Sequence, residues 1–117
     1  MSEKILDDDD LELEEYKDEA EKQVILRTHE RINRDLNGEI IKHEIGYVEL
    51  RLTTTAEMVA DSLGLIHGGF IFSAADYAAM VAVNERNVVL VASDCQFLSP
   101  VKFHDEVNVI ARVRHKE

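Results

Sequence analysis

The stretch GLIHGGFIFSAADYAAMVAV, residues 64–83, decides the fold. After the pair Gly68 and Gly69 it is apolar on almost every side and rich in alanine, which is typical of a helix. A helix that is hydrophobic all round belongs in the middle of a domain. The sequence therefore predicts a central helix over residues 70–83 that the rest of the domain covers.

Segments with the pattern of β-strands lie on both sides of this helix. Residues 39–43 and 47–53 are predicted strands, and the second alternates apolar with polar side chains. After the helix, residues 88–101 predict a long strand broken at Pro100, and residues 107–115 predict another. We therefore expect an α+β domain in which a mainly antiparallel sheet wraps round a central buried helix.

The chain begins with a segment of different composition. Residues 1–15 are a low-complexity acidic stretch, for which we expect disorder. The segment that follows repeats apolar side chains every three or four positions and ends at Asn37 and Gly38, a helix stop signal. The sequence thus predicts a disordered acidic arm, an additional N-terminal helix over 16–38 and a domain over 39–117.

Charge and length exclude several classes of protein. The net charge is −11, but residues 1–21 hold eleven acids against two lysines, so the remainder is nearly neutral. A nucleic-acid groove needs clustered Lys and Arg, so we expect no nucleic-acid partner. Residues 70–83 are too few to span a membrane, and no signal peptide is evident, so we expect a cytoplasmic protein. A core of roughly 95 residues is only marginally stable alone, which favours oligomerisation.

Asp76 is the one charged residue in the apolar helix. Burying a carboxylate costs several kcal/mol unless it is paired or hydrogen-bonded. A structural interpretation bonds Asp76 to a nearby hydroxyl such as that of Ser73. A functional interpretation makes Asp76 a general base or a nucleophile.

The start of the same helix offers a second chemical group. Gly68 and Gly69 allow close approach of a ligand, and the first N–H groups of a helix can hold an anion or a developing oxyanion. Gly68 and Asp76 are eight residues apart, or about 12 Å along a helix. One carbonyl cannot touch both within one chain, so the catalytic interpretation requires two antiparallel copies across a two-fold axis.

The motif GLIHGG, with Asp76 nine residues after His67, resembles the hotdog-fold acyl-CoA thioesterases, especially the phenylacetate-pathway type. FLSPVKFHDEV, residues 97–107, is similar to the family's segment that ends in Pro-Val, a basic residue and an acidic one. The resemblance covers roughly residues 39–115. It implies a sheet wrapped round a helix, two subunits joined edge to edge, and acyl-CoA sites at that interface.

The resemblance also implies roles for single residues. The Gly68 amide would polarise the thioester carbonyl, and Asp76 would activate water or attack directly. Six residues before His67, where relatives often place Asn or Gln, this chain has Asp61, a carboxylate that cannot donate a hydrogen bond to a thioester oxygen. No cofactor is expected beyond coenzyme A as part of the substrate or ligand. The residues expected to bind the substrate are His67, Gly69, Phe70, Ser73 and, for a CoA phosphate, Lys102.

Two alternatives remain open at this point. Hotdog hydratases carry Asp, Asn and Pro just ahead of the His, whereas residues 61–67, DSLGLIH, lack the Asn and the Pro. The malonyl-CoA-responsive repressors are non-enzymatic hotdog proteins without an acid at the helix position. Asp76 favours an enzyme, while Asp61 and the acidic arm favour a regulatory or interaction protein. Family members usually continue for one more hairpin after the position of Glu117, so we expect either that the given sequence is trimmed or that this part of the sheet is absent.

The other His and Cys residues give no catalytic pattern. The single cysteine, Cys95, cannot form an internal disulfide, and we expect it to be a small buried hydrophobe. His67 is expected to fix its loop, and the other histidines lack metal-ligand spacing, so we assign no metal. The pocket for the acyl chain is expected to be lined by Val59, Leu65, Phe70, Phe72 and Met80.

Overall fold

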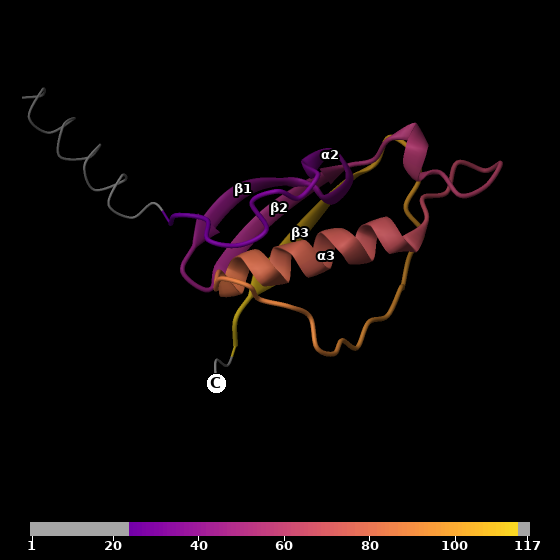
Figure 1. Ribbon diagram of the computed structural model, residues 1–117. Coiled ribbons are helices and arrows are strands. Elements are labelled where there is room, and N and C mark those ends of the chain that lie inside the picture. Colours follow the sequence, from indigo (N-terminus) through magenta and orange to yellow (C-terminus); the bar gives the residue numbers. More distant parts are fainter. Residues whose placement is uncertain (1–23, 115–117) are drawn as a thin grey trace, which may run out of the picture.

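The computed structural model describes residues 24–114 (Figure 1). In chain order its elements are α2 (Arg34–Asn37), β1 (Glu39–Glu44), β2 (Tyr47–Thr53), the 3₁₀-helix η1 (Ala56–Met58), α3 (Gly68–Val83) and β3 (Glu106–Arg112). The strands form one antiparallel sheet in the order β1-β2-β3, and α3 lies along one face of it. This is the predicted arrangement of an antiparallel sheet around a long helix. The predicted disordered arm over 1–15 lies outside the described residues.

The hairpin of β1 and β2 follows the strand prediction closely. Ile45 and Gly46 form its turn, and Gly46 has φ +73°, a left-handed conformation that favours glycine. The register between the strands shifts between Ile40 and Lys42, which marks an irregularity in β1. The two strands predicted over 39–43 and 47–53 are therefore confirmed.

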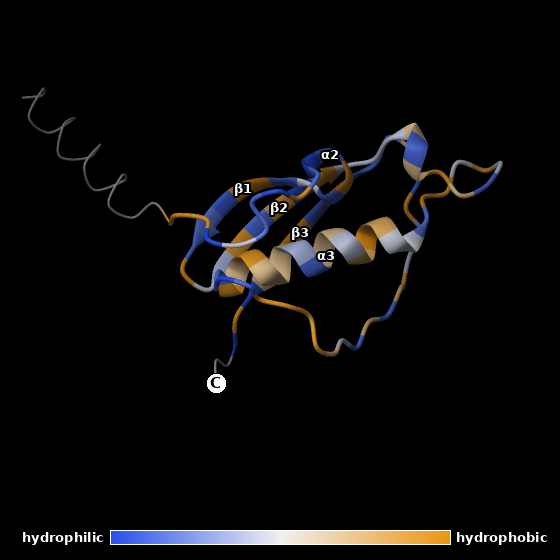
Figure 2. Cartoon of the chain, viewed as in Figure 1, coloured by the Kyte–Doolittle hydropathy of each residue, from blue (hydrophilic) through white to orange (hydrophobic). Residues whose placement is uncertain are grey.

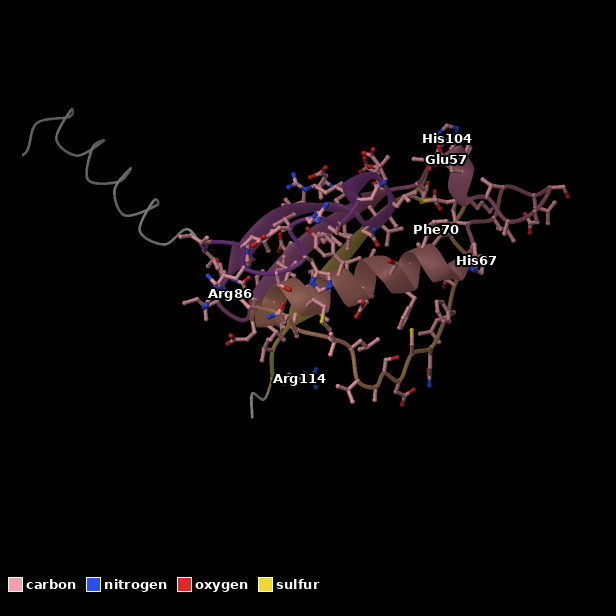
Figure 3. All side chains as sticks on the ribbon, viewed as in Figure 1. Glu57, His67, Phe70, Arg86, His104 and Arg114 are labelled. Carbon is pink, nitrogen blue, oxygen red and sulfur yellow. The ribbon has the colours of Figure 1, made fainter. Side chains whose placement is uncertain are left out.

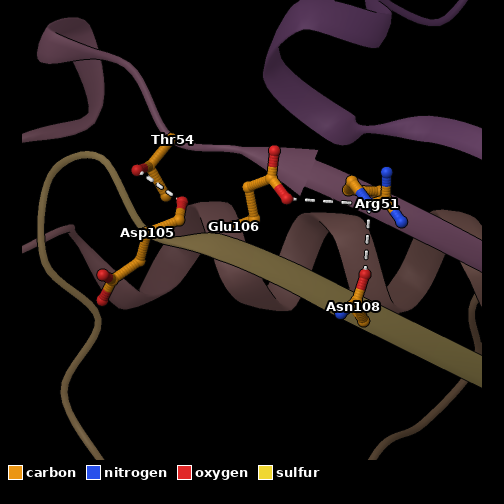
Figure 4. Close-up of polar contacts among 5 residues, drawn as sticks. All are labelled: Arg51, Thr54, Asp105, Glu106 and Asn108. Carbon is orange, nitrogen blue, oxygen red and sulfur yellow. Dashed lines mark hydrogen bonds and ion pairs between the residues drawn. The ribbon is translucent and has the colours of Figure 1, made fainter.

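Polar side chains join β2 to β3 on the outer face of the sheet (Figure 4). The Nε of Arg51 donates to the Oδ1 of Asn108 at 3.3 Å and lies 3.9 Å from the Oε2 of Glu106. Where β2 ends, the hydroxyl of Thr54 donates to the backbone oxygen of Asp105 at 2.8 Å. The strand predicted over 107–115 corresponds to β3, and position 115 lies outside the described residues.

The core lies between the sheet and α3. Every second side chain of β2 (Val48, Leu50 and Leu52) is fully buried, because successive side chains of a strand point to opposite faces. Figure 2 shows apolar residues along these strands and along α3. The helix contributes small residues and one large aromatic residue to the same cluster, namely Ala74, Tyr77, Ala78, Val81 and Ala82.

The helix α3 confirms the predicted central helix and starts two residues earlier. It ends at Asn84, which has the left-handed conformation common at helix ends, and the Asn84 N–H donates to the Met80 carbonyl at 2.8 Å. No helix in the described part of the chain is long and apolar enough to cross a membrane. The cytoplasmic location stays a prediction.

The predicted N-terminal helix over 16–38 is wrong for residues 24–33. In the described part of that span only Arg34–Asn37 is helical. The backbone groups that a helix would have used are taken by a side chain: Asn84 Nδ2 donates to the carbonyl of Ile25 at 2.9 Å, and its Oδ1 accepts from the N–H of Arg27 at 2.7 Å. His29 also has φ +53°, which no α-helix accommodates. Residues 16–23 lie outside the described residues.

The strand predicted over 88–101 is also wrong. Among the described residues no backbone hydrogen bond involves residues 88–100, and the segment runs on the side of α3 away from β1 and β2 (Figure 1). A strand needs a neighbouring strand to bond with, and within one chain this segment has none. Its side chains are largely exposed, including Val91 at 92% and Leu98 at 85%. Cys95, expected to be buried, is exposed for the same reason.

Candidate functional site

The glycine pair at the start of α3 has a steric explanation. A Cβ on Gly69 would lie 2.9 Å from Cδ2 and from Nε2 of the His67 ring, which is closer than real contacts of this kind. A Cβ on Gly68 would lie 3.3 Å from the ring of Phe97. Because glycine has no Cβ, Gly69 leaves room for the His67 ring and Gly68 leaves room for the Phe97 ring at the first turn of the helix.

His67 is held by its backbone and packs through its ring. Its N–H donates to the Met58 carbonyl at 2.9 Å, and its carbonyl accepts from the Phe70 N–H at 3.1 Å. The His67 and Phe70 rings meet edge to face with centroids 6.2 Å apart. The side chain of His67 is exposed and does not cap the helix. The role of His67 in fixing its loop stays a prediction.

The first two N–H groups of α3 have no protein partner among the described residues. Neither Gly68 nor Gly69 donates a backbone hydrogen bond to another described residue. Unpaired N–H groups at a helix start carry partial positive charge and attract a negatively polarised oxygen. Gly68 can therefore polarise a carbonyl that reaches it.

Gly68 lines a cleft of about 470 Å³. One wall is a single stripe of α3, at spacings of three and four residues: Gly68, Ile71, Phe72 and Ala75. The other wall is the segment Cys95–Val101, with Ile66 at the end of the cleft. Apart from Gln96 and Ser99 the lining is apolar or small, as in sites that accept an apolar ligand.

The structure places the predicted pocket residues differently. Of the five side chains expected to line the acyl pocket, only Phe72 lines this cleft. Phe70 and Val59 pack against the hydrophobic core, and Met80 is buried. The segment 95–101 was missed as a wall because it was expected to be a strand. Ile71 and Ala75 follow Gly68 by three and seven residues, which places all three on one face of a helix, and this spacing could have predicted the helical wall.

Asp76 lies on α3 outside the lining of this cleft. Its Oδ1 is buried and has no hydrogen-bond partner among the described residues. The predicted structural bond to Ser73 is not formed, because the Ser73 hydroxyl donates to the side-chain oxygen of Asn37 instead. A buried, unpaired carboxylate oxygen is rare in folded proteins and is typical of functional groups.

Asp61 shapes the loop that precedes His67. Its Oδ1 accepts hydrogen bonds from the N–H of Leu63 at 3.0 Å and from the N–H of Leu65 at 3.1 Å. The residue is exposed, and these bonds account for an acceptor at this position. An amide oxygen would accept the same two bonds and leave an NH₂ group free to donate.

Lys102 lies next to the cleft without lining it. Its backbone N–H donates to the Oδ2 of Asp105 at 2.9 Å, and it bridges to Leu65, so the turn after Pro100 is tied to the loop before His67. Its side chain is exposed and forms no ion pair in the described part of the chain. Between residues 24 and 114 no three His, Cys, Asp or Glu side chains gather as metal ligands.

A long helix packed against an antiparallel sheet is the arrangement of the hotdog fold, and an apolar cleft lies at the start of that helix. Residues 63–117 match the family model of the thioesterase superfamily. A solved structure of protein PH1136 from Pyrococcus horikoshii is 46% identical with a TM-score of 0.77, and the match covers 79% of this chain and 71% of that one. The chain belongs to the thioesterase superfamily and has the hotdog fold.

Two curated relatives are similar to this chain over only part of their own length. The acyl-coenzyme A thioesterase PaaI of Escherichia coli (strain K12) is 36% identical over 83 residues, which are 69% of this chain and 59% of PaaI. A methylthioribose-1-phosphate isomerase of Aquifex aeolicus (strain VF5) is 54% identical over 88 residues, which are 75% of this chain and 19% of that protein. The chain therefore spans less than two thirds of each of these relatives.

Proposed function

We propose that this chain binds acyl-CoA thioesters and hydrolyses them as a homodimer. The observation that carries the proposal is the unpaired N–H of Gly68 at the edge of an apolar cleft. Membership of the thioesterase superfamily and the similarity to PaaI support the substrate class. In this proposal the acyl group occupies the cleft and the thioester oxygen accepts from Gly68.

The second catalytic group in this proposal is Asp76 of the other copy. Within one chain Asp76 does not line the cleft of Gly68, and about 12 Å of helix separates the two residues. The carboxylate of Asp76 takes a proton from water as the water oxygen attacks the thioester carbon, or attacks that carbon itself. In both routes the tetrahedral intermediate expels the thiolate of coenzyme A. Where Asp76 itself attacks, the acyl group remains as a mixed anhydride with Asp76, and water hydrolyses this anhydride to the free acid and the Asp76 carboxylate.

The test is thiol release from acyl-CoAs of increasing chain length, with binding measured in parallel. Asp76→Asn is nearly isosteric and should lower kcat by about two to four orders of magnitude while acyl-CoA still binds. Glu57→Gln, an exposed position on η1, is the matched control and should leave kcat unchanged. An Asp76→Asn protein with full activity would remove Asp76 from the mechanism.

Asp61 favours a second candidate function, a non-enzymatic acyl-CoA-binding regulatory or interaction protein. Its carboxylate holds the loop before His67 but has no proton to donate to a substrate or a water. A protein that binds acyl-CoA without thiol release at any chain length would support this function. In that case the enzymatic proposal fails and the acyl-CoA site remains.

A further inference from the structure

A second cleft lies at the opposite end of α3. Its volume is about 840 Å³, larger than that of the cleft beside Gly68. Residues 27–32 form one side, and Arg86, Asn87 and Val88, just after the end of the helix, form the other. None of the residues of the proposed thioester site lines it.

Three arginines face this second cleft. Arg27, Arg31 and Arg86 line it together with a single acid, Glu30, and all three arginines are exposed. Residues 22–117 hold 13 acids against 11 Lys and Arg and are nearly neutral, so three arginines with one acid are a local excess of positive charge. In the part of the chain that the structure describes, no ion pair or hydrogen bond engages the three guanidinium groups. Three cations without a partner among residues 24–114 repel one another around one cleft and attract an anion.

The two walls are fixed relative to each other. The side chain of Asn84 bonds both the Ile25 carbonyl and the Arg27 N–H, so the segment before the cleft is fastened to the end of α3. Each wall also contains a residue other than glycine with left-handed backbone, His29 at φ +53° and Asn87 at φ +57°. Such conformations are uncommon and cluster where the backbone clamps a ligand.

His29 also lines the cleft, and the centroid of its ring lies 6.1 Å from that of the Tyr77 ring. Its Nδ1 shares a hydrogen bond of 2.8 Å with the hydroxyl of Thr28. Its Nε2 has no partner among the described residues.

Figure 3 shows Arg86 beyond the end of α3, far from His67 at the start of that helix.

We infer that this cleft binds a polyphosphate group at a site separate from the thioester cleft. Guanidinium groups bind phosphate oxygens through paired N–H donors, which is why several arginines around one cleft recognise di- and triphosphates. The polyphosphate belongs either to a coenzyme A molecule or to a free nucleotide, and both present the same diphosphate chemistry. The inference goes beyond the proposed function, because it does not require hydrolysis of any thioester.

A simpler role would explain only one of the three arginines. Arg86 follows the C-terminus of α3, where a cation offsets the partial negative charge of the helix end. Arg27 and Arg31 come from a different segment and have no such role. Affinity for phosphate separates the two explanations, since charge compensation of a helix changes stability and not ligand binding.

The test is calorimetric titration of the full chain with inorganic pyrophosphate, ADP and coenzyme A at low ionic strength. We expect saturable binding that added salt weakens. Arg31→Gln and Arg86→Gln should each lower the affinity for pyrophosphate by about tenfold or more. Arg51→Gln, which removes the same charge on the outer face of the sheet, is the matched control and should leave that affinity unchanged.

Displacement of bound pyrophosphate by coenzyme A or by ADP shows which of the two molecules supplies the phosphate groups. If coenzyme A displaces pyrophosphate, and Arg31→Gln weakens both, the cleft holds the nucleotide end of coenzyme A. If ADP displaces pyrophosphate and coenzyme A does not, the ligand is a free nucleotide. Both outcomes support a polyphosphate site, and both are independent of thiol release, so a failure of the hydrolysis proposal is seen separately.

Two outcomes would overturn the inference. One is the absence of saturable binding for all three probes at millimolar concentration by a protein with a native circular dichroism spectrum. Another is an equal loss of affinity in Arg51→Gln, which would show nonspecific attraction.

Discussion

The hydroxyl of Ser73 donates a hydrogen bond to the side-chain oxygen of Asn37 and so joins the middle of α3 to the end of α2. Asn37 is buried, and its Nδ2 donates in turn to the backbone oxygen of Asn33 at 2.9 Å. One amide thus holds the short helix α2 against the central helix. The bond also occupies the hydroxyl that was expected to meet either Asp76 or the substrate.

Replacing Asn37 by Ala should lower the free energy of unfolding by about 1 to 3 kcal/mol, because a buried hydroxyl loses its partner together with a second bond. Denaturation by urea measures this change. Asn108→Ala, at an exposed position on β3, should cost less. Equal losses in the two variants would show that the bond between Ser73 and Asn37 contributes nothing.

Asp61 can be tested by two substitutions that separate its structural role from a chemical one. Asp61→Ala removes the acceptor for Leu63 and Leu65 and should lower the free energy of unfolding by about 1 kcal/mol. Asp61→Asn keeps an acceptor, so the melting temperature should stay close to that of the native chain. The same variant gains a donor and should raise the rate of thiol release if the carboxylate limits turnover. A lower rate in Asp61→Asn would instead show that the charge itself is needed.

Gly69 and His67 should be energetically coupled. Gly69→Ala places a Cβ where the His67 ring lies, so the exposed ring has to rotate away and lose its contact with Phe70. A double-mutant cycle with His67→Ala should give a coupling energy of about 0.5 to 1.5 kcal/mol. Additive effects of the two substitutions on stability would contradict the contact.

Tyr77 should make the fold sensitive to alkaline pH. Burial raises the pKa of Tyr77 above its ordinary value of 10.0. As pH rises through 10.0, Tyr77 loses its phenolic proton in the unfolded chain before it does so in the folded chain. The contribution of Tyr77 to the free energy of unfolding is therefore fully present below pH 10.0 and is lost between pH 10.0 and the raised pKa. Tyr77→Phe should flatten the decline of melting temperature in this range. An unchanged decline, or a titration of Tyr77 by ultraviolet absorbance at its ordinary pKa, would contradict the effect of burial.

The proposed homodimer predicts at least twice 13.3 kDa by light scattering at micromolar concentration. Val91 is 92% exposed within one chain, so Val91→Lys should leave the fold of a single copy intact while a charge weakens pairing of the exposed segment 88–98 with a partner. Ile45→Lys, in the β-hairpin turn and 94% exposed, is the matched control. A native chain that is monomeric and still hydrolyses acyl-CoA would contradict the shared site.

The parts of the fold that could be predicted are those whose pattern is local. The alternation of Val48, Leu50 and Leu52 is a property of β2 alone, and the all-round apolar surface of α3 requires burial whatever covers it. Residues 24–33 carry a helical pattern too, but the amide of Asn84, almost sixty residues away in sequence, bonds their backbone. A hydrogen bond between residues so far apart in the sequence cannot be predicted from a local pattern.

The candidate site was predicted in part for the same reason. The sequence singles out Gly68, His67 and Asp76 as candidates because their spacing lies within one helix and the loop before it, and their roles stay predictions. The wall formed by residues 95–101 depends on how a segment without strand partners lies against α3, which is a tertiary property. The exposure of Cys95 follows from that placement and not from its apolar neighbours in sequence.

The helix α3 also acts as a spacer of fixed length. Its 16 residues form about 24 Å of helix, with Gly68 at the start of this length and the arginine cleft beyond its end. A rigid rod of this length keeps a small anion at one end from reaching the other, so pyrophosphate and a short acyl group should titrate independently within one copy. Inserting a full helical turn would lengthen the rod by about 5.4 Å and preserve which faces meet the sheet, whereas inserting two residues would rotate the two clefts against each other.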